Sequence, residues 1–186
     1  MLDPDFAVNK EILFNNTHSK EIIDGHNFIA EFLSGKLHGS ILDIGERNPL
    51  TIKLEKRFNC KIDNTSGDLD IYFCSDKHEY DVILFSHVIE HLFNPLSCLL
   101  QIKTKLKDDG TLYIATPRCP ENLKLNWTTG HFHEFDEYRM GKLLKRAGFN
   151  IVDKTYYKRN IGGFNGIRPI LKKLLYKNVI YTVVKA

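Results

Sequence analysis

Short apolar segments alternate along this chain with stretches in which apolar residues recur every three or four positions. The most constraining segment is DVILFS (residues 81–86), a near-continuous apolar run typical of parallel strands that are buried on both faces. Parallel neighbours must be joined by long crossovers, which are usually helices. The alternation therefore predicts a doubly wound α/β fold, with a mostly parallel sheet and helices on both of its faces.

The pattern predicts where the elements lie. We expect helices over residues 17–37, 49–58, 95–107, 136–148 and 168–177, with Asn94-Pro95 separating a short helix from the third of these. We expect strands over residues 40–45, 60–63, 81–86, 111–117, 149–158 and 178–184, and a further extended piece at 69–73. Residues 1–186 are expected to form one domain, in which a helical lead-in (1–39) precedes the α/β core (40–186).

Composition and length exclude several classes of protein. A chain of 186 residues suits one domain, and no apolar run approaches the roughly 20 residues of a membrane helix. The first residues, MLDPDFAVNKE, carry acids where a secretory signal carries positive charge. The four cysteines form no C-x-x-C pair, which favours reduced thiols over a zinc knuckle or a disulfide framework. We therefore expect a cytoplasmic protein without a bound metal.

Charge is distributed unevenly. Residues 138–186 contain 12 Lys and Arg but a single acid, Asp153. This region suits an anionic partner such as a phosphorylated substrate, a nucleic acid or a lipid surface, or it is simply a solvated basic face. The segment RPILKKLLYK (168–177) is expected either to dock on an anionic membrane or lipid-linked substrate, or to pack on the sheet. No RNA-binding motif is visible, so nucleic acid ranks below small acceptors.

Two acids stand at the ends of the first two expected strands. Asp43 precedes Gly45 at the first strand end, and Asp63 ends the second strand 20 residues later. Ligands of such sheets bind at the carboxyl ends of the strands, where a carboxylate can accept both hydrogens of a ribose diol. The spacing thus indicates a nucleotide-like ligand, although aspartates at strand ends also serve simply as turn formers.

The segment HVIEH (87–91) matches H-x-x-E-H, a zinc-protease pattern in which two histidines one helical turn apart bind the metal. A zinc hydrolase is therefore one hypothesis. Against it, His87 directly follows a buried strand, and Asn94-Pro95 ends the expected helix after barely two turns.

Five segments together carry a family resemblance: ILDIG, the acid Asp63, DVILFSHVIEHLFNP, LKDDGTLYIATP and GHFHEFDEYRMGKLLKRAGFNIV. In this order they resemble the small class I S-adenosylmethionine-dependent methyltransferases over residues 40–152. The resemblance implies a Rossmann-like, seven-stranded sheet whose last strand is antiparallel. It also implies S-adenosylmethionine as the cofactor, and methyl transfer to a small-molecule, sugar or lipid-linked acceptor, at oxygen.

The resemblance also assigns cofactor-binding residues. Asp43 and Gly45 would lie against the methionine end, Asp63 would hold the ribose, Asp68 or Leu69 would flank the adenine, and Ser86 and His87 would border the sulfur. One departure stands out, because Arg47 and Pro49 replace glycines that the family has beyond Gly45. Side chains there would intrude on the cofactor's amino-acid part. A methyltransferase-like protein that has lost catalysis and acts as a binding partner is therefore the alternative.

On the acceptor side, three residues are candidates for catalysis. His131 follows a segment expected to cross the mouth of the site, and a neutral imidazole can deprotonate a hydroxyl near pH 7. His91 is expected to act as a base or to hold the acceptor, and Glu90 lies beside it at the start of a helix. The alternative for these two is structural: Glu90 caps the helix, and His91 is a buried, hydrogen-bonded residue.

Overall fold

A computed structural model describes residues 20–118, 131–158 and 177–186 of the chain. The helical elements are α2 (Lys20–Phe32), α3 (Pro49–Phe58), the short 3₁₀ helix η1 (Ile89–His91), α4 (Pro95–Lys105) and α5 (Glu137–Ala147). The strands are β1 (Ile41–Asp43), β2 (Ile62–Asn64), β3 (Ser66–Asp68), β4 (Tyr72–Cys74), β5 (Tyr80–Ser86), β6 (Leu106–Arg118), β7 (Phe149–Tyr157) and β8 (Lys177–Lys185).

Six strands form the central sheet in the order β2-β1-β5-β6-β8-β7. Strands β2, β1, β5 and β6 are parallel neighbours, whereas β8 runs antiparallel between β6 and β7. The parallel strands bring their carboxyl ends to one edge of the sheet, which is where ligands of doubly wound folds bind. Residues 43–45, 64–65 and 86–87 therefore lie at this edge.

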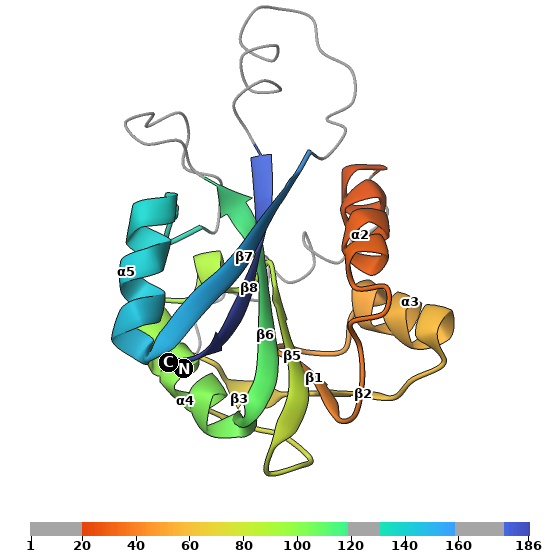
Figure 1. Ribbon diagram of the computed structural model, residues 1–186, viewed down its shortest axis with the longest axis horizontal. Coiled ribbons are helices and arrows are strands. Elements are labelled where there is room, and N and C mark those ends of the chain that lie inside the picture. The colour runs from red at the N-terminus through yellow and green to blue at the C-terminus, as the bar shows by residue number, and fades with distance from the viewer. Residues whose placement is uncertain (1–19, 119–130, 159–176) are drawn as a thin grey trace, which may run out of the picture.

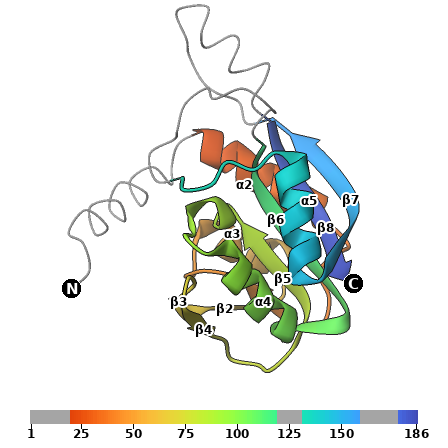
Figure 2. The ribbon, with the colours of Figure 1, turned by 90° about the vertical axis from the view of Figure 1, so that its left-hand side faces the viewer.

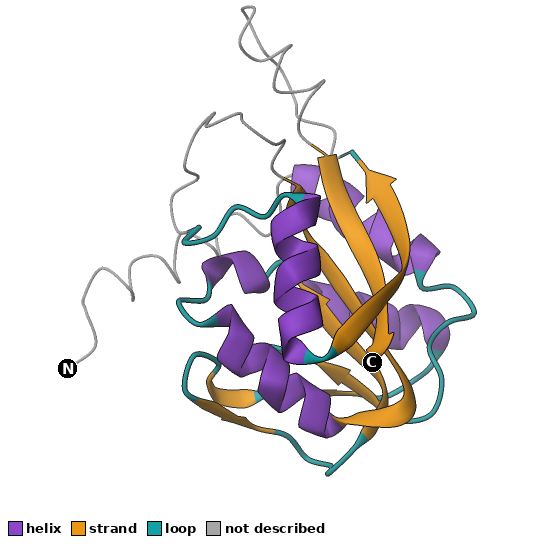
Figure 3. Cartoon of the chain, turned by 60° about the vertical axis from the view of Figure 1, so that its left-hand side comes forward, coloured by secondary structure: helices purple, strands orange, loops and turns teal. Residues whose placement is uncertain are grey.

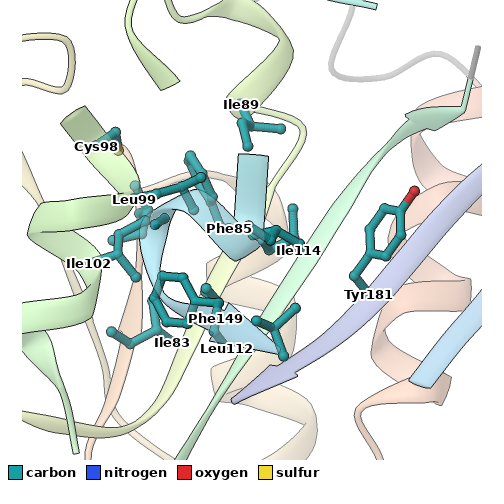
Figure 4. Packing of buried hydrophobic residues seen from close by; sticks show 14 of the residues in the cluster. Ile83, Phe85, Ile89, Cys98, Leu99, Ile102, Leu112, Ile114, Phe149 and Tyr181 are labelled. Carbon is teal, nitrogen blue, oxygen red and sulfur yellow. The ribbon is translucent and has the colours of Figure 1, made fainter. Parts of the chain in front are cut away.

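Helices cover both faces of the sheet (Figure 1). Helices α2 and α3 pack on one face through residues such as Ile29, Ala30 and Leu54. Helices α4 and α5 cover the other face, as Figure 2 and Figure 3 show from two further directions. In Figure 4, Leu99 from α4 lies in the buried cluster with Phe85 from β5. The sheet, with its ligand-binding edge, therefore lies between these two layers of helices.

Local sequence explains where the helices begin and end. Asn48 caps α3, because its side-chain oxygen accepts hydrogen bonds from the amides of Leu50 and Thr51, and Pro49 occupies the first helical position. Asp136 caps α5 in the same way, by accepting from the amide of Arg139. Helix α5 ends at Gly148, whose φ of 80° is the left-handed conformation that glycine adopts most easily.

The doubly wound fold and the antiparallel last strand are confirmed, with differences in detail. The described residues place six strands in the main sheet rather than seven, because β3 and β4 form a separate antiparallel hairpin. Strand β6 begins at Leu106 rather than at the expected residue 111, so residues 108–110, between the expected helix and strand, lie within it. The expected helix at 168–177 lies outside the described residues except for Lys177, which begins β8. None of the described helices combines the length and the hydropathy needed to cross a bilayer.

Candidate active site

Gly45 forms the turn that follows β1, at the ligand-binding edge. Its φ of 116° lies in the region that favours glycine, and a side-chain Cβ there would meet only Val88 Cγ2, at 3.8 Å. The amide of Gly45 donates to Thr65 Oγ1 at 2.7 Å, and its carbonyl accepts from Asn64 Nδ2 at 3.2 Å. The turn is therefore tied to the end of β2 while the space beside Gly45 stays open.

Asp43 is buried at the end of β1 and holds the start of α3. Its Oδ2 accepts from Thr51 Oγ1 at 2.5 Å and from Asn48 Nδ2 at 3.1 Å. Burial raises the pKa of this carboxyl to about 6, although hydrogen bonds from Thr51, Asn48 and Asn64 oppose the rise. The Asp43 side chain thus links the end of β1 to the start of α3 by hydrogen bonds and stabilises the turn between them.

Asp63, on β2, has both carboxylate oxygens buried without a hydrogen bond. The ammonium groups of Lys61 and Lys77 form ion pairs with these oxygens, at 3.2 Å and 3.4 Å. A carboxylate has about four acceptor positions on its two oxygens, so Asp63 can face these lysines and still accept from two adjacent hydroxyl groups. Asp63 therefore fits the ribose of a nucleotide-like cofactor.

Arg47 and Pro49, which replace the glycines of the family pattern, do not fill the space at the ligand-binding edge. Arg47 is half-exposed and pairs with Glu55 on α3, so its side chain is directed onto the helix. Pro49 is the first residue of α3. The side-chain intrusion expected from Arg47 and Pro49 is therefore not found. Together with the open space at Gly45 and the oxygens of Asp63, this arrangement fits S-adenosylmethionine.

The remaining cofactor candidates lie on two other elements. Asp68 is exposed in the β3–β4 hairpin, where its Oδ1 accepts from the amide of Asp70. Leu69 packs against the buried hydrophobic cluster that includes Leu99 and Ile102 of α4. Ser86 ends β5 and lines an apolar pocket beneath α2, together with residues that include Ile29 and Tyr113. The structure thus places Ser86 at the ligand-binding edge and Asp68 at the end of β3, next to the turn of the hairpin.

Glu90, His91 and His131 lie close together beyond the end of β5. Their ligand-type side-chain atoms are all within 4.8 Å of one another, and the two histidine rings meet edge to face with centroids 4.7 Å apart. Glu90 is buried, and its carbonyl accepts from the amides of Phe132 and His133 at 2.9 Å and 3.1 Å. These backbone bonds hold the segment that carries His131 against η1.

The Glu90 carboxylate is held from both sides. Its Oε1 lies 3.2 Å from His87 Nδ1, and its Oε2 accepts from Thr116 Oγ1 at 3.1 Å. Burial alone would raise the pKa of this carboxyl, but the hydrogen bond from His87 and the charges of His87 and His91 outweigh burial and lower it. Glu90 is therefore an ionised group in a buried position, beside the imidazoles of His87 and His91.

The helix that the zinc-protease pattern requires is not formed. Glu90 and His91 belong to a single 3₁₀ turn rather than to the start of a helix, and α4 begins only at Pro95. The ring nitrogens of His87 face Glu90 and the Tyr157 hydroxyl, at 3.2 Å and 2.8 Å. Glu90, His91 and His131 have the composition of a metal site, with ligand-type atoms within 4.8 Å of one another, but they do not form the helical arrangement of the zinc-protease pattern.

Several contributors escape prediction from sequence. Thr65 and Asn64 bind the Gly45 turn, and Thr116 and Tyr157 complete the surroundings of Glu90 and His87. Asn48 is the one with a readable signal, because an Asn before Pro is typical of a helix start. For Thr116 and Tyr157, which lie on β6 and β7, no local signal exists, since only the sheet order brings them to the site.

Solved structures share this fold at low identity. A Burkholderia thailandensis 1,6-didemethyltoxoflavin-N1-methyltransferase, with bound S-adenosylhomocysteine, matches with a TM-score of 0.65 at 16% identity, over 100% of this chain and 92% of that one. A putative Haloferax volcanii methyltransferase in complex with the Trm112 activator matches with a TM-score of 0.67 at 13% identity, over 95% and 96% of the two chains. The mitomycin 7-O-methyltransferase MmcR matches with a TM-score of 0.61 at 16% identity, over 95% of this chain and 57% of that one.

No curated protein sequence matches the chain. The model of one protein family does, under the description "Methyltransferase domain", and it covers residues 12–154. That match spans most of the chain and includes every candidate site residue. The chain therefore belongs to the methyltransferase-domain family and is an S-adenosylmethionine-dependent methyltransferase.

Proposed function

We propose that this methyltransferase transfers the methyl group to an oxygen of a small-molecule, sugar or lipid-linked acceptor. The observation that carries the proposal is the cluster of Glu90, His91 and His131 beside the carboxyl end of β5. An ionised carboxylate next to two imidazoles is a suitable arrangement for removing a hydroxyl proton. The mitomycin 7-O-methyltransferase, which shares the fold, is named for transfer to oxygen.

In this proposal the cofactor lies across the ends of β1, β2 and β5. Asp63 accepts hydrogen bonds from the ribose hydroxyls, and the Gly45 turn leaves room for the methionine part. Asp43 supports that turn from below, Asp68 or Leu69 flanks the adenine, and Ser86 and His87 border the sulfur. The structure supports the first two roles through the oxygens of Asp63, which make no hydrogen bond, and the open space at Gly45.

When bound, the cofactor supplies a methyl group on a positively charged sulfur, which needs no metal to be reactive. The acceptor oxygen forms a bond to the methyl carbon as the carbon–sulfur bond breaks, and S-adenosylhomocysteine leaves. The hydroxyl proton passes to a ring nitrogen of His131. His91 lies against the His131 ring and orients it, while the negative charge of Glu90 favours the protonated imidazole. The protein thus contributes alignment and proton removal.

An anionic or lipid-linked acceptor is included because of the basic region at 138–186, which holds 12 Lys and Arg against one Asp. Positive charge at this end of the chain attracts phosphate or anionic lipid. We place the enzyme in the cytoplasm, with peripheral contact to a membrane if the acceptor is lipid-linked.

The test is a screen for methyl transfer with isotopically labelled S-adenosylmethionine and panels of hydroxylated acceptors: free sugars, sugar phosphates and lipid-linked sugars. The intact protein should label at least one acceptor at oxygen, and His131→Asn should lower the rate about 100-fold or more. His133→Asn is the matched control, because it changes a histidine two positions away on the same segment. Labelling at nitrogen or carbon, or equal rates for the two variants, would overturn the proposal.

A further inference from the structure

His87, the first residue after β5, has an unusual backbone conformation. Its φ is 55°, in the left-handed region that residues other than glycine seldom occupy. Such conformations persist only where the surrounding structure holds them, and they gather at functional sites. The amide of His87 donates to Ala115 O on β6 at 2.7 Å, which fixes the backbone in this state. The His87 side chain is thereby placed between the Glu90 carboxylate and the Tyr157 hydroxyl.

The partners of the ring determine which nitrogen carries the proton. Nδ1 lies 3.2 Å from Glu90 Oε1, and an ionised carboxylate can only accept a hydrogen bond. Nδ1 therefore carries the hydrogen. In the neutral ring Nε2 is then an acceptor, and its partner at 2.8 Å is the hydroxyl of Tyr157, which donates. In the neutral ring the direction of donation therefore runs from Tyr157 through His87 to Glu90, and a protonated ring donates to Glu90 through the same Nδ1.

Tyr157 is itself anchored on the other side of the sheet. It ends β7, is buried, and stacks on Phe28 of α2 with ring centroids 4.7 Å apart and planes 8° from parallel. At the other end of these hydrogen bonds, the Glu90 carboxylate accepts from Thr116. The Glu90 carbonyl accepts from the amides of Phe132 and His133, in the segment that carries His131. A continuous set of contacts therefore leads from α2 to the acceptor-side histidines.

We propose that His87 and Tyr157 are positioning residues of the methyltransferase site. Their hydrogen bonds fix the Glu90 carboxylate next to His91 and His131. Through these bonds, the packing of α2 on Tyr157 influences the position of the cluster. Neither residue needs to touch the acceptor for this role. The inference rests on the proposed function, in which the cluster removes the acceptor's proton.

The distinguishing observable is the state of the imidazoles. In the described residues the titratable groups facing Glu90 are His87, His91 and His131, so a change in the position of Glu90 alters the charge that each histidine feels. Nitrogen-15 NMR of the ring nitrogens reports both the tautomer and the titration of each histidine. It requires neither cofactor nor acceptor, so its result is independent of whether methyl transfer is detected.

The critical variant is Tyr157→Phe, which keeps the ring against Phe28 and removes only the hydroxyl. The matched control is Tyr156→Phe, because the neighbouring hydroxyl donates instead to Glu137 at 2.8 Å, away from His87. We expect intact protein in which His87 Nδ1 carries a proton, and altered ring nitrogen-15 shifts of His91 and His131 in Tyr157→Phe at matched pH. Tyr156→Phe should leave the ring shifts of both histidines unchanged.

A second variant, Phe28→Leu, keeps the Tyr157 hydroxyl and weakens the stacking from α2. It should change the same ring shifts by a smaller amount if α2 is coupled to the cluster. The proposal is overturned if His87 of the intact protein carries a proton only at Nε2, or if the ring shifts of His91 and His131 in a folded Tyr157→Phe protein match those of the intact one. Loss of labelled product with unchanged NMR behaviour would instead count against the proposed function alone.

Discussion

The cofactor edge at Gly45 and the cluster around Glu90 are built differently. At the edge, the side-chain hydrogen bonds of Asp43 and those of the Gly45 turn join residues between 43 and 65, within one strand-turn-helix-strand unit. Around Glu90, the partners come from positions 87, 116, 132, 133 and 157. A local unit forms as soon as β1 and β2 pair, whereas the cluster requires the whole sheet in its final order. Changes at the edge should therefore act on binding and local stability, and changes at the cluster on turnover.

The largest expected effect belongs to the cluster. Glu90→Gln removes the negative charge while keeping the size of the side chain, and it leaves the imidazoles without their carboxylate. Because positioned proton transfer contributes about 100- to 10,000-fold, kcat for methyl transfer should fall within that range. The affinity for S-adenosylmethionine should change little, as measured by calorimetric titration.

The matched control is Glu79→Gln, an exposed acid far from the cluster in the described structure, which should retain full turnover. If Glu90→Gln weakened cofactor binding as strongly as turnover, the division between the two regions would be wrong.

The next effect concerns Asp43 at the edge. Its pKa is raised to about 6 by burial, so the folded state holds this proton over a range in which the unfolded state has released it. Stability attributable to Asp43 is therefore present below about pH 4 and is lost as pH rises to about 6. Asp43→Asn cannot ionise, so urea unfolding should show the intact protein losing about 3 kcal/mol relative to the variant across this window. A pH-independent difference would contradict the burial of an ionisable group here.

A smaller effect separates conformation from space at Gly45. An alanine Cβ there meets only Val88 at 3.8 Å, so the cost of Gly45→Ala is the positive φ, about 1 to 2 kcal/mol of unfolding free energy. Gly141→Ala is the control, because a Cβ there meets nothing within 4 Å and lies inside α5, where alanine stabilises by roughly 0.5 to 1 kcal/mol. Opposite signs in thermal or urea unfolding are expected, and equal signs would contradict the turn geometry.

The smallest effect is expected from metal removal. The zinc-protease helix is not formed, and transfer from a positively charged sulfur needs no metal, so a chelator should leave methyl transfer within experimental error. Elemental analysis of the same preparation should find far less than one zinc per chain. Stoichiometric zinc together with loss of activity in the chelator would replace proton removal by His131 with metal chemistry.

The sequence predicts the local unit better than the cluster. The apolar run of β5, the cap and proline of α3, and the spacing of Asp43 and Asp63 are readable because each depends on neighbours in the chain. The extended piece expected at 69–73 overlaps β4, but β3 is not readable, since residues 66–68 are polar and exposed and carry no strand pattern. Thr116 and Tyr157 were missed because their role depends on which strands become neighbours, a property set by tertiary packing.

The most direct test of the central claim is calorimetric titration of the purified protein with S-adenosylmethionine and S-adenosylhomocysteine. The intact protein and an Asp76→Asn control, in which an exposed acid is changed, should bind both with micromolar affinity. Asp63→Asn should weaken binding about 100-fold, because charge-assisted hydrogen bonds to the ribose are worth about 1.5 to 3 kcal/mol each. Absence of binding by the intact protein would contradict the claim that the ends of β1 and β2 form a cofactor site.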